Sequence, residues 1–110
     1  MSFPRSRPRR MRRTEALRSF VRETDLAPHH LIAPLFVKEG IRDPQPIASM
    51  PGQSQHTLES LRKEAREIAA RGVPAIVLFG VPSSKDPAGS QASDPDGIAQ
   101  LGLKELREEL

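Results

Sequence analysis

The two short apolar runs of the chain constrain its fold more than any other feature. The segment LIAPLFV occupies positions 31–37, and AIVLF occupies positions 75–79. Unbroken apolar runs of this length are typical of strands that are buried on both faces of a parallel sheet. We therefore expect an α/β fold in which parallel strands are joined by a right-handed crossover.

The segment between these runs contains the clearest helix signal. We expect a helix from Leu58 to about Arg71, with Gly72 as its C-terminal stop. Its apolar face consists of Leu58, Leu61, Ala65 and Ile68, and its polar face pairs Lys63 with Glu59 and Glu67. This amphipathic pattern predicts that one side of the helix packs on the sheet.

Prolines and glycines predict the remaining boundaries. Pro34 has no N–H to donate to a ladder, so the first strand is expected to begin there. Residues 40–56 are expected to form an ordered loop with a turn at Met50-Pro51-Gly52. A last helix is expected to start with Asp94 as its N-cap and Pro95 at its first position, and its apolar residues are Ile98, Leu101 and Leu106.

Two strands with exposed apolar edges do not make a stable sheet by themselves. Natural proteins avoid such edges by adding strands or by closing a barrel. We therefore expect residues 31–110 to be the opening piece of a larger α/β domain.

The basic charge of the chain is confined to its first segment. Residues 1–22 contain eight arginines and one glutamate, so their net charge is +7. Since the whole chain has a net charge of +3, residues 23–110 carry −4. Residues 1–13 are expected to be extended or disordered without a partner, and Thr14 is a good N-cap for a short helix that includes Leu17, Phe20 and Val21. This arm could bind nucleic acid, an anionic membrane or an acidic surface of a partner subunit.

Composition excludes several classes of protein. The 110 residues contain no cysteine, which rules out a disulfide framework and a thiolate metal site. No apolar stretch approaches the roughly 18 residues of a spanning helix, and none follows the arginines as in a secretory signal. We expect a cytoplasmic protein without membrane contact.

Three motif-like strings have better structural explanations. The adjacent His29 and His30 point in different directions in any regular element, which makes them a poor metal pair. Asp94-Pro95-Asp96-Gly97 lacks the spaced ligands and closing Glu of a calcium loop. Residues 80–85, GVPSSK, lack the glycine that precedes the lysine of a phosphate-binding loop, and no Ser or Thr follows the lysine.

Three residues follow or end the predicted strands, where active sites of parallel α/β folds gather. Lys38 and Lys85 are either ordinary surface lysines or site residues, and nothing in the sequence shows that either is desolvated. Phe79 either packs in the core or lines a pocket.

Six strings, in order, resemble the N-terminal third of the porphobilinogen synthase family, also called delta-aminolevulinic acid dehydratase. The resemblance runs from about Arg7 to Leu110. The strings are RPRRMRRTEALRSFVRET at 7–24, LIAPLFVKEGI at 31–41, PIASMPG at 46–52, PAIVLFGVP at 74–82, KDPAGSQAS at 85–93 and DPDGIAQ at 94–100. The loop GSQAS at 89–93 departs slightly from the family pattern.

The resemblance implies a lyase whose fold is a TIM (β/α)8 barrel. An arm precedes the barrel and contacts a neighbouring subunit, and the family commonly forms homo-octamers. Residues 1–30 would be the arm with its short helix, and residues 31–110 the first two β/α units. The family condenses two molecules of 5-aminolevulinate to porphobilinogen with loss of water, in tetrapyrrole and heme biosynthesis. Its two Schiff-base lysines lie on later strands. Its zinc or magnesium ligands also lie beyond Leu110.

The resemblance assigns no catalytic residue and no metal ligand within this chain, and none of Lys38, Lys63, Lys85 or Lys104 matches a catalytic position. It implies that Phe79 is a hydrophobic wall of the substrate pocket and that Arg9, Arg10, Arg12 and Arg13 contribute to subunit contacts. The 110 residues alone are expected to be inactive. The alternative is a small basic module that binds nucleic acid or a partner subunit through its arm.

Overall fold

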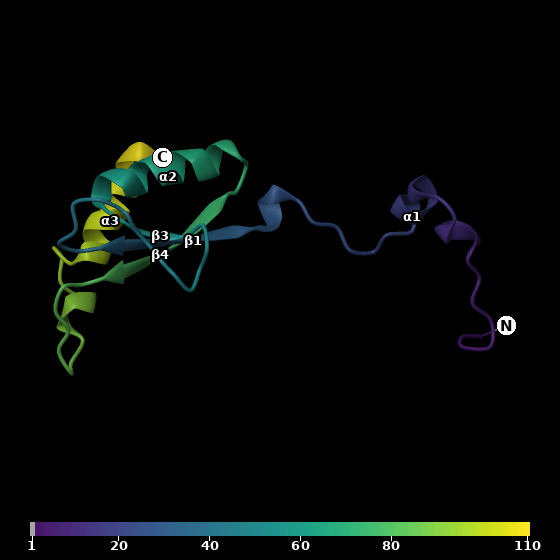
Figure 1. The fold of residues 1–110 in the computed structure, drawn as a ribbon, viewed down its shortest axis with the longest axis horizontal. Coiled ribbons are helices and arrows are strands. Elements are labelled where there is room, and N and C mark those ends of the chain that lie inside the picture. The colour runs from purple at the N-terminus through teal and green to yellow at the C-terminus, as the bar shows by residue number, and fades with distance from the viewer. Residues whose placement is uncertain (1) are drawn as a thin grey trace.

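The computed structural model describes residues 2–110 and consists of a compact α/β body with an arm projecting from it (Figure 1). Its principal extents are 64 × 33 × 26 Å. The arm contains a 3₁₀ turn at Arg10–Arg12 and α1 at Glu15–Phe20, and a second 3₁₀ turn at Pro28–His30 leads into the sheet. Thr14 caps α1 as predicted, because its Oγ1 accepts a hydrogen bond from the amide of Leu17 at 3.1 Å.

The body contains a four-stranded sheet in the order β2-β3-β1-β4. The strands are β1 (Ile32–Lys38), β2 (Gln45–Pro46), β3 (Ser54–His56) and β4 (Ala75–Val81). β1 runs parallel to β4 and to β3, whereas β2 is antiparallel to β3. The parallel pairing of the two apolar runs is therefore confirmed, but the sheet has two short strands that the sequence did not reveal.

Pro34 lies inside β1, so the prediction that the strand begins there is wrong. The amide of Glu39 points toward β4, because it donates to the carbonyl of Val81 at 2.9 Å. Alternate residues point the other way, which places the nitrogen of Pro34 on the β3 side. Since β3 pairs only with Phe36 and Val37, no neighbouring strand there needs the missing N–H.

The expected loop at 40–56 forms a small hairpin. Its turn is confirmed, because Gln53 donates to the carbonyl of Met50 at 3.0 Å and Gly52 adopts a φ of 84°. The hairpin returns the chain to the sheet at β3, immediately before the next helix.

Two helices, α2 (Leu58–Ala70) and α3 (Ile98–Glu109), cover one face of the sheet (Figure 1). The bounds of α2 agree with the prediction, and Gly72 follows it with a φ of 85°. The start of α3 was predicted wrongly. Asp94 closes a turn by accepting from the amide of Asp96, and Gly97 is the N-cap.

The core lies between this helical layer and the sheet. Its buried side chains are Leu35, Val37, Leu61, Ala65, Ile98 and Leu106. The opposite face of the sheet is open: Val77 and Phe79 are 43% and 48% exposed. No helix within residues 2–110 is long and apolar enough to cross a bilayer.

Candidate functional site

The carboxyl ends of β1 and β4 meet at one edge of the sheet. Their parallel register places Phe36 beside Phe79 and Lys38 beside Val81. In parallel α/β folds the loops that leave this edge form the binding site. The edge is therefore the candidate functional site of the described chain.

Phe79 belongs to the open face of the sheet at this edge. Its neighbours Ile76 and Leu78 pack against the core, whereas the Phe79 ring points to the other side and stacks on Phe36. The ring centroids are 5.2 Å apart and the ring planes differ by 19°. Phe79 is therefore not among the buried core residues of the described chain, and its ring is half exposed.

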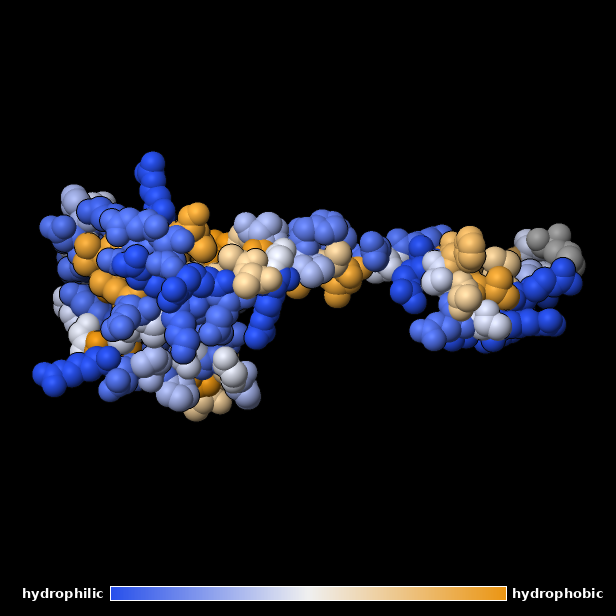
Figure 2. Space-filling model, turned by 90° about the horizontal axis from the view of Figure 1, so that it is seen from above, coloured by the Kyte–Doolittle hydropathy of each residue, from blue (hydrophilic) through white to orange (hydrophobic). Residues whose placement is uncertain are grey.

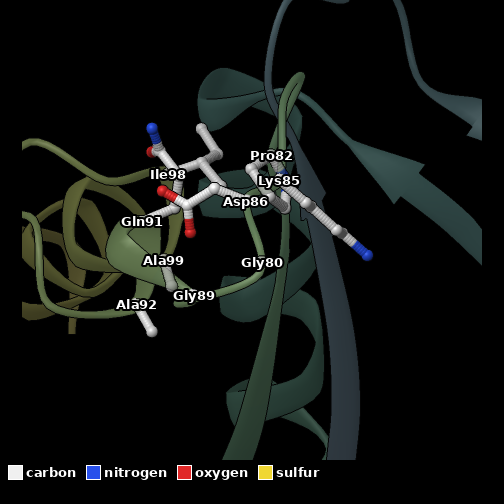
Figure 3. Close-up of a pocket in the computed structure, with 9 residues that line it drawn as sticks. All are labelled: Gly80, Pro82, Lys85, Asp86, Gly89, Gln91, Ala92, Ile98 and Ala99. Atoms are coloured by element: carbon white, nitrogen blue, oxygen red, sulfur yellow. The ribbon is translucent and has the colours of Figure 1, made fainter.

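The two candidate lysines have different surroundings. The Nζ of Lys38 donates to the Oε1 of Gln45 at 3.2 Å, which ties the end of β1 to β2. Lys85 is exposed, and its ammonium group points away from the cavity beside it (Figure 3). The structure therefore does not bring Lys38, Lys85 and Phe79 together into one site.

A cavity of about 360 Å³ lies between the loop after β4 and the start of α3 (Figure 3). Its wall is mainly apolar or glycine, and it includes Gly80, Pro82, Ile98 and Ala99. The carboxylate of Asp86 is engaged by Ser90, whose hydroxyl and amide both donate to it. These hydrogen bonds lower the pKa of Asp86, the hydroxyl contact most strongly. Asp86 thus stabilises the loop.

Glu39 joins the ends of β1 and β4, and sequence reasoning missed it. Its amide donates to the carbonyl of Val81, and its Oε2 accepts from the amide of Ser83 at 3.0 Å. The available signal was its position two residues after the first apolar run, close to the one that selected Lys38.

The histidine pair has a local role. His30 Nδ1 accepts from the amide of Ala27 at 3.1 Å, and the two imidazole rings pack edge to face. Within residues 2–110, no group of three His, Cys, Asp or Glu side chains is placed to hold a metal ion. The described residues therefore do not fit the metal that the resemblance implies.

The arginines of the arm are exposed. Arg9, Arg10, Arg12 and Arg13 all lie in or beside the 3₁₀ turn that precedes α1. The guanidinium of Arg18 donates to the carbonyl of Arg12 at 3.1 Å, which holds this turn against the helix. The arm also exposes apolar side chains, including Phe3 and Phe20. Figure 2 shows apolar surface on the arm among hydrophilic residues.

Comparison with known proteins gives a consistent result. The family model described as delta-aminolevulinic acid dehydratase matches residues 5–110. Proteins of that name from Mycobacterium tuberculosis and Streptomyces coelicolor are each 50% identical over 111 residues, which is 99% of this chain and 34% of each relative. One from Methanothermus sociabilis is 46% identical over 109 residues, again 99% of this chain and 34% of the relative. The chain thus spans about a third of the length of these relatives.

A solved structure agrees in fold. The delta-aminolevulinic acid dehydratase (porphobilinogen synthase) of Toxoplasma gondii, in complex with the reaction product porphobilinogen, matches with a TM-score of 0.87 and 37% sequence identity. The match covers 94% of this chain and 30% of that protein. The family match over nearly the whole chain and the shared fold lead to one conclusion: the chain belongs to the delta-aminolevulinic acid dehydratase family.

Proposed function

We propose that these residues form the first part of a porphobilinogen synthase, a lyase that condenses two molecules of 5-aminolevulinate to porphobilinogen with loss of water. The observation that carries this proposal is the match of residues 5–110 to the family model. The parallel β1 and β4, with aromatic side chains at their carboxyl edge, are consistent with it.

In this proposal residues 31–110 are the first two β/α units of a TIM barrel, and residues 1–30 are an arm outside it. The free edge of β4 supports further strand pairing, because an unpaired edge with apolar side chains is unfavourable in water. The exposed face that carries Val77 and Phe79 would become the interior of the barrel.

Phe79 is proposed as a hydrophobic wall of the substrate pocket. Its half-exposed ring at the carboxyl edge supports that role, because a ring buried under the helices could not touch a substrate. The Schiff-base chemistry would come from lysines on later strands. A zinc or magnesium site would likewise require residues outside this segment, because the described residues form no suitable cluster.

The arm is proposed to contact a neighbouring subunit of a cytoplasmic homo-oligomer, such as the octamer common in the family. Arg9, Arg10, Arg12 and Arg13 are exposed, and guanidinium groups can form bidentate pairs with carboxylates. Exposed Phe3 and Phe20 add apolar surface that a partner could cover. No observation favours nucleic-acid binding by the arm.

The test is an assay of porphobilinogen formation from 5-aminolevulinate. The complete protein that carries this sequence is expected to form the product, and residues 1–110 alone are expected to form none, since a quarter of a barrel cannot close. A folded complete protein without activity would refute the proposed function. Product formation by the 110 residues alone would refute the assignment of catalysis to later strands.

A further inference from the structure

We infer that Glu39 is a positioning residue that fixes the exit of β4, and with it the placement of Phe79, through a hydrogen bond to the backbone of Ser83. The inference deepens the proposed function and rests on it, because it assigns to Glu39 a part in building the substrate wall. Glu39 itself is not proposed to touch the substrate.

The contact between Glu39 and β4 has two components. The backbone amide of Glu39 donates to the carbonyl of Val81 at 2.9 Å, which is the last bond between the two strands. The side chain then reaches one step further, and its Oε2 accepts from the amide of Ser83 at 3.0 Å. Glu39 thereby holds β4 and its exit on both sides of Pro82.

Pro82 explains why the contact between the Glu39 side chain and Ser83 matters for the exit of β4. Pro82 has no N–H, so the amide of Ser83 is the first donor after Val81 that can fix the chain. The next hydrogen bonds of this loop within the described chain begin at Asp86, which accepts from Ser90 and from the amide of Gly89. Without the carboxylate of Glu39, residues 82–85 would lose their attachment to β1.

The carboxylate is not explained by core packing or by an ion pair. The Glu39 side chain is exposed, and it forms no salt bridge among residues 2–110. The chain turns immediately after it, where Gly40 adopts a φ of 80° that favours glycine. The exposed carboxylate therefore remains at the edge of the sheet, beside the loop that it holds.

Phe79 lies only two residues before Val81, in the same strand. Its ring rests on Phe36, which lies three residues before Glu39 in β1. The aromatic stack and the Glu39 contact therefore join the same two strand ends. Loosening the exit of β4 would allow the Phe79 ring to move relative to the rest of the edge, which would displace a proposed wall of the pocket.

The test compares Glu39→Ala with Glu39→Gln in the complete protein. Glutamine keeps an oxygen that can accept from the Ser83 amide, whereas alanine does not. Glu67→Ala, an exposed site in α2, controls for removal of one negative charge. The measurements are hydrogen exchange of the 82–85 segment by mass spectrometry, and kcat and KM for 5-aminolevulinate.

Glu39→Ala is expected to lose exchange protection at Ser83 and to lower kcat/KM roughly tenfold, mainly through KM, because the pocket wall is misplaced. Glu39→Gln is expected to keep the protection and stay within about twofold of the unmodified protein in kcat/KM, because its acceptor remains. Glu67→Ala should change neither.

Three results would overturn the inference. They are unchanged Ser83 exchange in Glu39→Ala, lost protection with unchanged kinetic constants, and a Glu39→Gln variant as impaired as Glu39→Ala. Failure of the proposed function is distinguishable, because the unmodified protein would then form no porphobilinogen. The exchange measurement would still decide whether Glu39 fixes the exit of β4.

Discussion

His56 is buried at the end of β3, where the sheet passes into α2. Its Nδ1 lies 3.1 Å from the hydroxyl of Ser60, which also receives a hydrogen bond from the amide of Thr57. Thr57 in turn caps α2 by accepting from the amide of Ser60. Burial lowers the pKa of His56 below its usual 6.5, and the nearby charge of Glu64 opposes this only in part. The neutral imidazole of His56 therefore takes part in the hydrogen bonds at the N-terminus of α2.

This arrangement predicts that acid destabilises the fold through His56. Below pH 6.5 the unfolded chain binds a proton at this position more readily than the folded chain. The contribution of neutral His56 to the free energy of unfolding is therefore fully present above pH 6.5. It is lost as the pH drops through 6.5 toward the lower pKa of the folded state. The limiting slope is about 1.4 kcal/mol per pH unit for one proton.

The measurement is the free energy of unfolding of the complete protein between pH 5 and pH 8, for the unmodified protein and for His56→Gln. The variant should lose this part of the pH dependence. His29→Gln, which removes an exposed histidine, is the control. An unchanged slope in His56→Gln would contradict the assignment.

At the residue scale, Phe79 could be placed from the sequence, but its partners could not. The position of Phe79 at the end of an apolar run indicates the carboxyl edge of a strand. Contacts with Phe36 depend on strand register, and an unbroken apolar run does not reveal which face each residue occupies. The contact of Glu39 with Ser83 depends in addition on the loop conformation, which no periodicity encodes.

At the scale of elements, α3 packs unusually closely on the sheet through glycines. A Cβ at Gly80 would lie 2.8 Å from the Cβ of Ala99 and 3.0 Å from its backbone nitrogen. A Cβ at Gly102 would lie 2.9 Å from the Cδ2 of Leu78. The contacts at Gly80 are with the backbone and Cβ at the start of a helix. The contacts at Gly102 are with side-chain ends only, including Val37 Cγ1 at 3.2 Å and Leu61 Cδ2 at 3.4 Å, and the nearest of them, Leu78, can change its rotamer.

Gly80→Ala is therefore expected to lower stability by about 1–3 kcal/mol, because overpacking must displace α3. Gly102→Ala should cost less, since Leu78 can adjust and alanine gains about 1 kcal/mol in helix propensity. Thermal unfolding of the two variants in the complete protein gives the comparison. A Gly102→Ala variant that is the less stable of the two would contradict this account of the packing.

The polar contacts between α2 and α3 were not predictable from one helix alone. Helical spacing suggested pairs of Lys63 with Glu59 and Glu67, but these are not among the salt bridges of residues 2–110. Instead Arg62 pairs with Glu105 at 2.8 Å and with Glu109 at 3.0 Å, and Arg66 pairs with Glu109 at 2.9 Å. The Glu109 contact is the main cause of a raised pKa at Arg62.

The elements themselves were predicted unevenly for a physical reason. α2 has a periodic apolar face, a threonine N-cap and a terminal glycine, so its bounds follow from local signals. β2 and β3 contain only two and three residues, and their sequence is polar or proline. β3 is ordered by pairing with β1, and β2 is ordered by pairing with β3. The pairing of β3 with β1 joins segments that are distant in sequence. The Asp94 prediction failed because an aspartate turn and an N-cap have the same local sequence signal.

At the scale of the whole molecule, the proposed contact of the arm with a neighbouring subunit rests on the opposite charges of the arm and the remainder. The arm carries +7 within residues 1–22, whereas the rest of the chain carries −4. Replacing Arg9, Arg10, Arg12 and Arg13 with glutamine in the complete protein is expected to reduce the size of the oligomer, because paired guanidinium groups are lost.

The oligomer prediction is tested by light scattering after size-exclusion chromatography. Replacing the exposed Arg42, Lys63, Arg71 and Lys104 of the body with glutamine removes the same charge and should leave the oligomer intact. An unchanged mass in the arm variant, or an equal loss in the body variant, would contradict the role of the arm.

A parallel α/β body and a separate basic segment were predictable in outline, because the apolar runs and the arginines lie in different parts of the sequence. The strand order was not, since the hairpin that occupies part of the second edge of β1 has no local signal. The further strands of a barrel are inferred from the family and from the exposed face around Val77 and Phe79.

The most direct test of the central claim is a chimaera in which these 110 residues replace the matching third of the Mycobacterium tuberculosis relative, which is 50% identical over this region. The account predicts a folded chimaera, of the same oligomeric mass as the relative, that forms porphobilinogen from 5-aminolevulinate. A folded chimaera of that mass that forms no porphobilinogen would contradict the claim that this chain supplies the first two β/α units of a working synthase.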